Sequence, residues 1–149
     1  MYSFVLGLHN IWRWIVLIVG VWAVFLVWRG WLGRRQWTPA EARATRVFTV
    51  VLDVQFLLGL LLFAVFSPLT RQGFSDFGGA MRDAPVRYFL LEHPLIMLIA
   101  IAAAHIGAVQ VRRSSSDAER FQKASLLFGL SLAAVAGFIP WARPLIPSF

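Results

Sequence analysis

Cysteine is absent from this chain of 149 residues. Its absence excludes disulfide bonds, iron–sulfur clusters, thiolate metal sites and covalent attachment of a c-type haem. Charged residues are also scarce, at 14% of the chain, whereas a soluble domain has about a quarter. No nucleophile stands with a base in a recognisable constellation, so hydrolytic chemistry is not expected.

Apolar residues fill the chain instead, at 59% of the total. They form four long segments, residues 4–28, 47–66, 86–111 and 121–139, and each has roughly the 20 residues that cross the hydrocarbon core. A backbone in lipid must satisfy its own hydrogen bonds, so each segment is expected to be helical. The short connections predict an all-α fold, an antiparallel four-helix bundle that forms a single membrane domain over residues 1–149.

Basic residues gather on one side of these segments. The first and third connections carry nine of them: Arg29, Arg34, Arg35, Arg43, Arg46, Arg112, Arg113, Arg120 and Lys123. The opposite side carries four: Arg71, Arg82, Arg87 and Arg143. This bias places the first and third connections in the cytoplasm and both termini outside, in the periplasm of a bacterium whose inner membrane holds the protein. The net charge of +7 is therefore attributed to topology and lipid contact, with no role in nucleic-acid binding.

Helix boundaries and packing stripes agree with four helices. Thr38 with Glu41, and Ser116 with Glu119, have the spacing of capping boxes, and Asp83 can cap the third helix. Prolines 140, 144 and 147 are expected to end the fourth helix and keep the tail irregular. Small residues recur every four positions on the last two helices, which predicts close packing between them, although the stripe could instead face a partner subunit. They are Ala100, Ala104 and Ala108, and Ser125, Gly129, Ala133 and Gly137.

Two histidines in the outer halves of the spans are the first candidates for function, because an ionisable residue inside a span is functional by default. His9 and His93 are expected at similar depth on parallel helices that face each other diagonally across the bundle. A diagonal of about 11–14 Å suits a flat macrocycle with an imidazole on each face. Arg13 and Arg87 lie on the same side and could pair with haem propionates. The alternative is that both histidines hydrogen-bond water, lipid or each other.

Glu92 stands beside this pair and has two interpretations. It can form an ion pair with Arg13 or Arg87, or it can accept a proton from a quinol, because an apolar site raises the proton affinity of a carboxylate. The ion pair is favoured. Pro94 follows His93 directly, removes a helical hydrogen bond and can kink the third helix.

A second polar layer is expected deeper in the membrane, with Asp53, Gln55 and His105. Asp53 and His105 should lie at similar depth on neighbouring helices, so a hydrogen-bonded pair that satisfies both groups is the simplest interpretation. His105 could instead bind a second haem. The chain has only three histidines, so one protomer can complete a single bis-histidine site.

The stretches Leu8-His9-Asn10-Ile11-Trp12-Arg13-Trp14 and Asp53-Val54-Gln55-Phe56-Leu57-Leu58-Gly59, the Ser67-Pro68-Leu69 turn and Glu92-His93 resemble a group of small bacterial four-helix membrane proteins labelled cytochrome b-like. The resemblance extends over nearly the whole chain. The chain also looks broadly like the larger membrane cytochromes b, whose four-helix cores hold haem between histidines on facing helices. This chain departs from two-haem cytochromes b because it has no second histidine pair.

These observations favour a membrane cytochrome b-like protein with one haem b near the outer face, which exchanges electrons with quinone or a periplasmic redox protein. Such a protein is an electron carrier or a subunit more than a stand-alone enzyme. The alternative is a cofactor-free accessory subunit of a larger respiratory or photosynthetic complex. In either case other membrane subunits, or further copies of this chain, are expected partners beside the lipid.

Overall fold

The computed structural model describes residues 1–141. Its helices are α1 (Tyr2–Leu32), α2 (Pro39–Leu61), α3 (Pro68–Ser75), α4 (Phe77–Ala80), α5 (Ala84–Arg87), α6 (His93–Arg113) and α7 (Asp117–Gly137), with π-helical turns η1 (Leu62–Phe66) and η2 (Tyr88–Glu92). No strand occurs in this part of the chain, so the all-α prediction is confirmed. Arg143, Pro144 and Pro147, which served the topology and tail predictions, lie outside the described residues.

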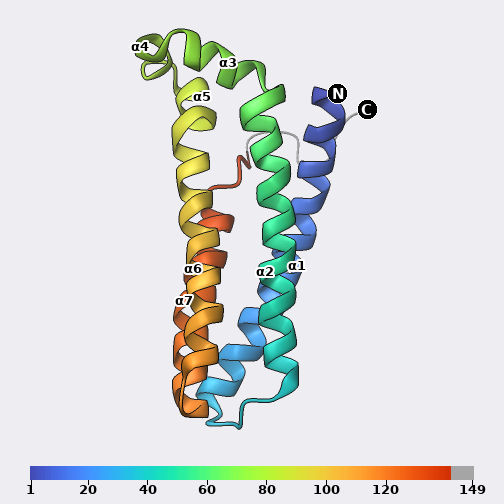
Figure 1. The fold of residues 1–149 in the computed structure, drawn as a ribbon, viewed down its shortest axis with the longest axis vertical. Helices are drawn as coiled ribbons and strands as arrows, with labels where there is room; N and C mark the ends of the chain where they lie inside the picture. Colours follow the sequence, from blue (N-terminus) through green and yellow to red (C-terminus); the bar gives the residue numbers. More distant parts are fainter. Residues whose placement is uncertain (142–149) are drawn as a thin grey trace.

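Four long helical rods lie side by side (Figure 1). They are α1, α2 with η1, the continuous helix from α5 through η2 to α6, and α7. The rod of α1 packs on α2 and α7, while α6 packs closely on α7 and more loosely on α2. The helices α1 and α6 are therefore diagonal partners, as the alternating topology predicts.

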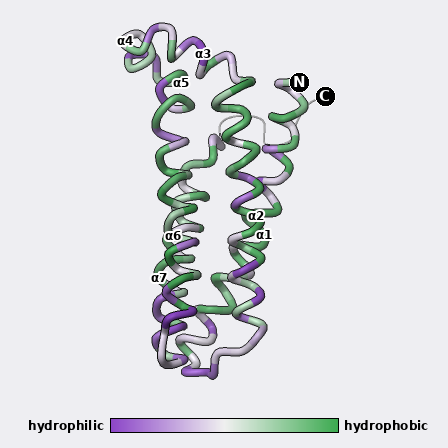
Figure 2. Tube along the Cα trace, viewed as in Figure 1, coloured by the Kyte–Doolittle hydropathy of each residue, from purple (hydrophilic) through white to green (hydrophobic). Residues whose placement is uncertain are grey.

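Three of these rods are long and apolar enough to cross a membrane: Tyr2–Leu32, Pro39–Phe66 and Ala84–Arg113. The helix α7 occupies the fourth predicted segment but is not one of the three among the described residues. Hydrophobic residues dominate the middle of every rod, and hydrophilic residues concentrate at the end with the α1–α2 and α6–α7 connections (Figure 2). Every rod begins before its predicted apolar segment, whereas α7 ends at Gly137, two residues before the predicted end at residue 139.

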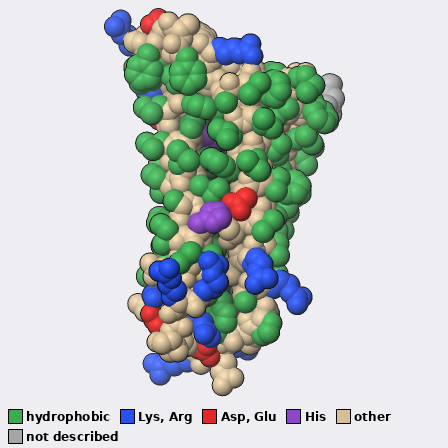
Figure 3. Space-filling view, in the orientation of Figure 1, with side chains coloured by type: hydrophobic (Ala, Val, Ile, Leu, Met, Phe, Trp, Pro, Cys, Tyr) green, Lys and Arg blue, Asp and Glu red, His purple; other side chains and the backbone are tan. Residues whose placement is uncertain are grey.

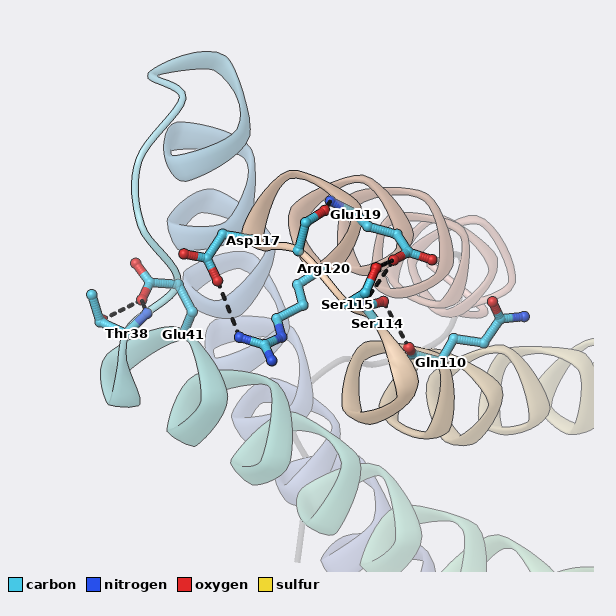
Figure 4. Close-up of polar contacts among 9 residues, drawn as sticks. Thr38, Glu41, Gln110, Ser114, Ser115, Asp117, Glu119 and Arg120 are labelled. Carbon is cyan, nitrogen blue, oxygen red and sulfur yellow. Dashed lines mark hydrogen bonds and ion pairs between the residues drawn. The ribbon is translucent and has the colours of Figure 1, made fainter.

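The two predicted capping boxes lie at the hydrophilic end (Figure 4), and the Asp83 cap lies at the opposite end of the bundle (Figure 1). Thr38 and Glu41 make the full reciprocal capping box of α2. Ser116 accepts a hydrogen bond from the Glu119 N–H, but the Glu119 carboxylate turns to the backbone N–H and hydroxyl of Ser115. Asp83 caps α5 through the Val86 N–H. These side chains satisfy N–H groups that a helix start leaves without partners.

The larger apolar core occupies the half of the bundle nearer the α1–α2 and α6–α7 connections. Phe48, Phe121 and Phe128 are fully buried there, beside Ala100 and Ala104 of the predicted α6 stripe. The helices α6 and α7 lie close together at Gly107, where a Cβ would meet Leu127 Cβ at 3.0 Å.

The predicted close packing of α6 on α7 is confirmed, but two of the small residues of α7 lie against α1. The Trp28 indole of α1 lies over Gly129 and donates to the Ser125 carbonyl at 3.2 Å. Ser125 and Gly129 therefore accommodate a bulky tryptophan of α1, whereas Ala133 and Gly137 are exposed.

Candidate functional site

The two outer histidines meet in the half of the bundle that lies beyond the apolar core. His9 on α1 and His93 at the start of α6 have ring centroids 6.5 Å apart, with the ring planes at 73°. Both side chains are partly buried. The predicted equal depth and diagonal placement are thus what the structure shows.

Hydrogen bonds define the proton positions on His93. Its Nδ1 lies 2.9 Å from the Phe138 carbonyl oxygen, which can only accept, so Nδ1 carries the proton. In the neutral ring the lone pair is then on Nε2. An N–H held by a backbone carbonyl is the usual support of a metal-binding histidine.

The same carbonyl also anchors a tyrosine. Tyr88 Oη donates to the Phe138 oxygen at 2.7 Å, and its ring centroid lies 5.8 Å from that of His93. Phe138 directly follows the last helical residue of α7, where carbonyls have no acceptor role inside the helix. The end of one helix therefore orients the histidine of its neighbour.

His9 is held by Gln55 of α2. The Gln55 amide nitrogen lies 3.1 Å from the His9 carbonyl oxygen and 3.2 Å from His9 Nε2. An amide nitrogen only donates, so Nε2 accepts here and the neutral ring carries its proton on Nδ1. Both His9 Nδ1 and Gln55 Oε1 are buried without a hydrogen-bond partner among residues 1–141.

These two orphan atoms belong to one adjustable unit. A buried polar atom without a partner costs about 1–3 kcal/mol, so its presence calls for a ligand or a rearrangement. Rotation of the Gln55 amide, which gives up its hydrogen bond to the His9 carbonyl, would let Oε1 accept a hydrogen bond from a protonated His9 Nε2, and the neutral ring would then carry its lone pair on Nδ1. Gln55 therefore belongs to this site, although its position along the sequence predicted the Asp53 layer.

Arg13 brings positive charge to the histidine pair. Its side chain is 6% exposed although it lies in the middle of α1, and it interacts electrostatically with both imidazoles. A buried guanidinium beside two neutral rings makes the surroundings of the pair electropositive. The predicted grouping of Arg13 with the outer histidines is what the structure shows.

Glu92 and Arg87 form the ion pair that was favoured from the sequence. Arg87 Nε lies 2.7 Å from Glu92 Oε1, and Arg87 Nη1 donates to the Met81 carbonyl at 3.0 Å. Both side chains are about two-fifths exposed, at 39% and 38%, so the pair lies at the rim of the site.

Pro94 changes the helix in a specific way. The π-helical turn η2 precedes it, and the His93 N–H donates to the Tyr88 carbonyl five residues back. The wider turn lies just before Pro94, which has no N–H to donate to the helix. Turns of this π-helical kind are frequent at functional sites.

Asp53 and His105 make the predicted pair, with His105 Nε2 at 2.8 Å from Asp53 Oδ1. The pair lies outside the bundle, with side chains 40% and 54% exposed. A histidine and an acidic side chain are visible midway along the face between α2 and α6 (Figure 3). His105 is therefore separate from the His9–His93 site.

Among residues 1–141, no three histidine, aspartate or glutamate side chains come together as a metal site. The two imidazoles are thus the donor set that the outer site offers. Comparison with protein-family models, with curated proteins and with solved structures finds no match, so the resemblance to cytochrome b-like proteins stays a prediction and the interpretation of the site depends on its geometry.

Proposed function

We propose that this protein is a membrane electron carrier that holds one haem b between His9 and His93. The observation that carries the proposal is the pair of imidazoles on diagonal helices, with ring centroids 6.5 Å apart. Each ring is fixed by a neighbouring helix: His93 by the Phe138 carbonyl and His9 by Gln55. The haem would supply one-electron redox chemistry.

The donor set fits such a group. His93 presents a lone pair on Nε2, and His9 can present one on Nδ1 once the Gln55 amide rotates. Arg13 supplies buried positive charge for a propionate, and Arg87 stands at the rim in its pair with Glu92. The residues of this chain would thus bind and orient the haem and neutralise its propionates, while the haem would supply the redox chemistry.

The proposal includes four membrane crossings, in the inner membrane of a bacterium. The basic cluster at one end of the molecule supports an orientation with the α1–α2 and α6–α7 connections in the cytoplasm (Figure 3). The chain termini and the histidine pair then face the periplasm. Quinone in the bilayer or a periplasmic redox protein would exchange electrons there.

The test is a reduced-minus-oxidised absorption spectrum of the purified protein. We expect a b-type signal that His93→Ala and His9→Ala abolish and that His105→Ala leaves intact. His105 is the matched control, because it is the remaining histidine and lies on the exterior. A protein without haem, isolated in a stoichiometric complex, would instead support the accessory-subunit hypothesis.

A further inference from the structure

A cavity opens on the exterior of the bundle along α6, away from the histidine pair and towards the cytoplasmic end of the proposed orientation. It has a volume of about 470 Å³ and is lined by His105, Ile106, Val109, Gln110, Arg113 and Lys123. Binding pockets for small ligands usually measure about 300–1,000 Å³. The cavity is therefore large enough for the polar part of an amphiphile.

The lining changes from apolar to cationic along the helix. Ile106 and Val109 form the middle, and Arg113 lies at the end of α6 with the basic connection. The distance along the axis from His105 to Arg113 is about 12 Å at 1.5 Å per residue. This order matches a molecule with an anionic end at the membrane surface and an apolar part deeper in the bilayer.

The cations at the surface end have hydrogen-bonding capacity to spare. Within residues 1–141, Arg113 has no ion pair or hydrogen bond through its side chain. Lys123 is engaged by Glu119 at 2.5 Å, which uses one of its three ammonium donors. Two positive charges against one carboxylate leave this end of the cavity positive.

One neutral polar side chain, that of Gln110, lies between the charged and the apolar parts of the cavity. The side-chain amide of Gln110 points away from the capping contacts around Ser114 and Ser115 (Figure 4). His105 closes the deeper end, with one ring nitrogen held by Asp53. The amide can donate to the ester and glycerol oxygens of a lipid.

We propose that this cavity binds one anionic phospholipid, with its phosphate on Arg113 and Lys123 and its acyl chains along Ile106 and Val109. The proposal rests on the membrane insertion in the proposed function and is independent of haem. A lipid fits better than a soluble phosphate, because half of the Ile106 surface is exposed on an apolar helix face. It would also cover the exposed edge of the Asp53–His105 pair.

The experiment measures lipid binding by native mass spectrometry of the full-length protein in non-ionic detergent. The probes are dioleoyl phosphatidylglycerol and dioleoyl phosphatidylcholine at equal concentration. The wild-type protein should prefer phosphatidylglycerol, and Arg113→Gln should weaken that binding about fivefold, the effect of one cation near the surface. Arg43→Gln is the charge-matched control, because Arg43 is exposed near the same end and does not line the cavity.

A second pair of variants tests occupancy without a change of charge. Ile106→Trp fills the cavity and should lower phosphatidylglycerol binding, whereas Leu126→Trp, on an exposed position outside the lining, should not. Equal affinity for the two lipids, or equal losses in Arg113→Gln and Arg43→Gln, would overturn the proposal. So would unchanged binding in Ile106→Trp, or displacement of the lipid by millimolar inorganic phosphate alone.

Discussion

Gly30 of α1 gives the sharpest test of the packing, because its replacement should destabilise a helix that alanine normally favours. A Cβ at Gly30 would overlap the Cε1 and Cζ atoms of Phe121. The Phe121 ring is fully buried and is held by Trp37, with ring centroids 5.0 Å apart. The ring has little room to retreat, so Gly30→Ala overpacks the core.

The magnitude follows from two opposing terms. Overpacking costs about 1–3 kcal/mol, and replacement of a helical glycine by alanine returns up to about 1 kcal/mol. We expect Gly30→Ala to lower the free energy of unfolding by about 1–2 kcal/mol. At Gly129 the added Cβ would lie 3.5 Å from Trp28, an ordinary contact, so Gly129→Ala should raise the free energy of unfolding by about 0.5–1 kcal/mol.

The assay is reversible unfolding in mixed detergent micelles, monitored by circular dichroism. Phe121→Leu should relieve the clash, so the double variant Gly30→Ala/Phe121→Leu should be more stable than the two single effects predict, by about 1 kcal/mol. The reasoning is refuted if Gly30→Ala stabilises the protein as Gly129→Ala does, or if the coupling energy is zero.

Three further predictions concern polar groups. If His9 binds haem as proposed, Gln55→Ala should lower haem retention at least about tenfold in a titration followed by absorbance, because it removes the side chain that supports His9; retention equal to wild type contradicts that role. His105→Leu should lower the free energy of unfolding in micelles by about 1 kcal/mol, because Asp53 loses its partner. Adding Asp53→Leu to the same chain should restore most of that loss, and additive losses in the double variant would exclude the pairing. The hydrogen bond from Lys123 lowers the pKa of Glu119 from 4.5 to about 2. The stabilisation is complete above pH 4.5 and is lost as the pH falls towards 2, so Glu119→Gln should flatten the melting temperature between pH 5 and pH 3. A slope identical to wild type would refute this.

The sequence correctly predicted the pairs of side chains that meet because they lie at the same depth on different helices. When successive apolar helices run in alternating directions, His9 and His93 come to the same height along the bundle, and so do Asp53 and His105. Glu92 with Arg87 is a local pair on one rod. Such inferences need only the length of each apolar segment and 1.5 Å per residue.

The direction in which side chains face did not follow from the sequence. In a membrane helix the lipid-facing and core-facing surfaces are both apolar, so no amphipathic pattern shows that Asp53 and His105 lie outside. The same ambiguity assigned the small residues of α7 to α6, whereas Ser125 and Gly129 lie against Trp28.

The contacts of Gln55 and of the Phe138 carbonyl were also missed. Every residue has a carbonyl, so none is singled out by sequence. Pro140 offered the one signal, because a proline soon after a helix marks where carbonyls lose their helical partners.

The Phe138 carbonyl oxygen accepts hydrogen bonds from both Tyr88 and His93, so the length of α7 determines how the His93 ring is oriented. One residue added to α7 would turn the following carbonyl by about 100° around the axis and advance it by about 1.5 Å. Both donors would lose their common acceptor at once. The orientation of His93 can thus be changed by an insertion or deletion in a neighbouring helix, with no substitution in the histidine's own rod, so the register of α7 is part of the site.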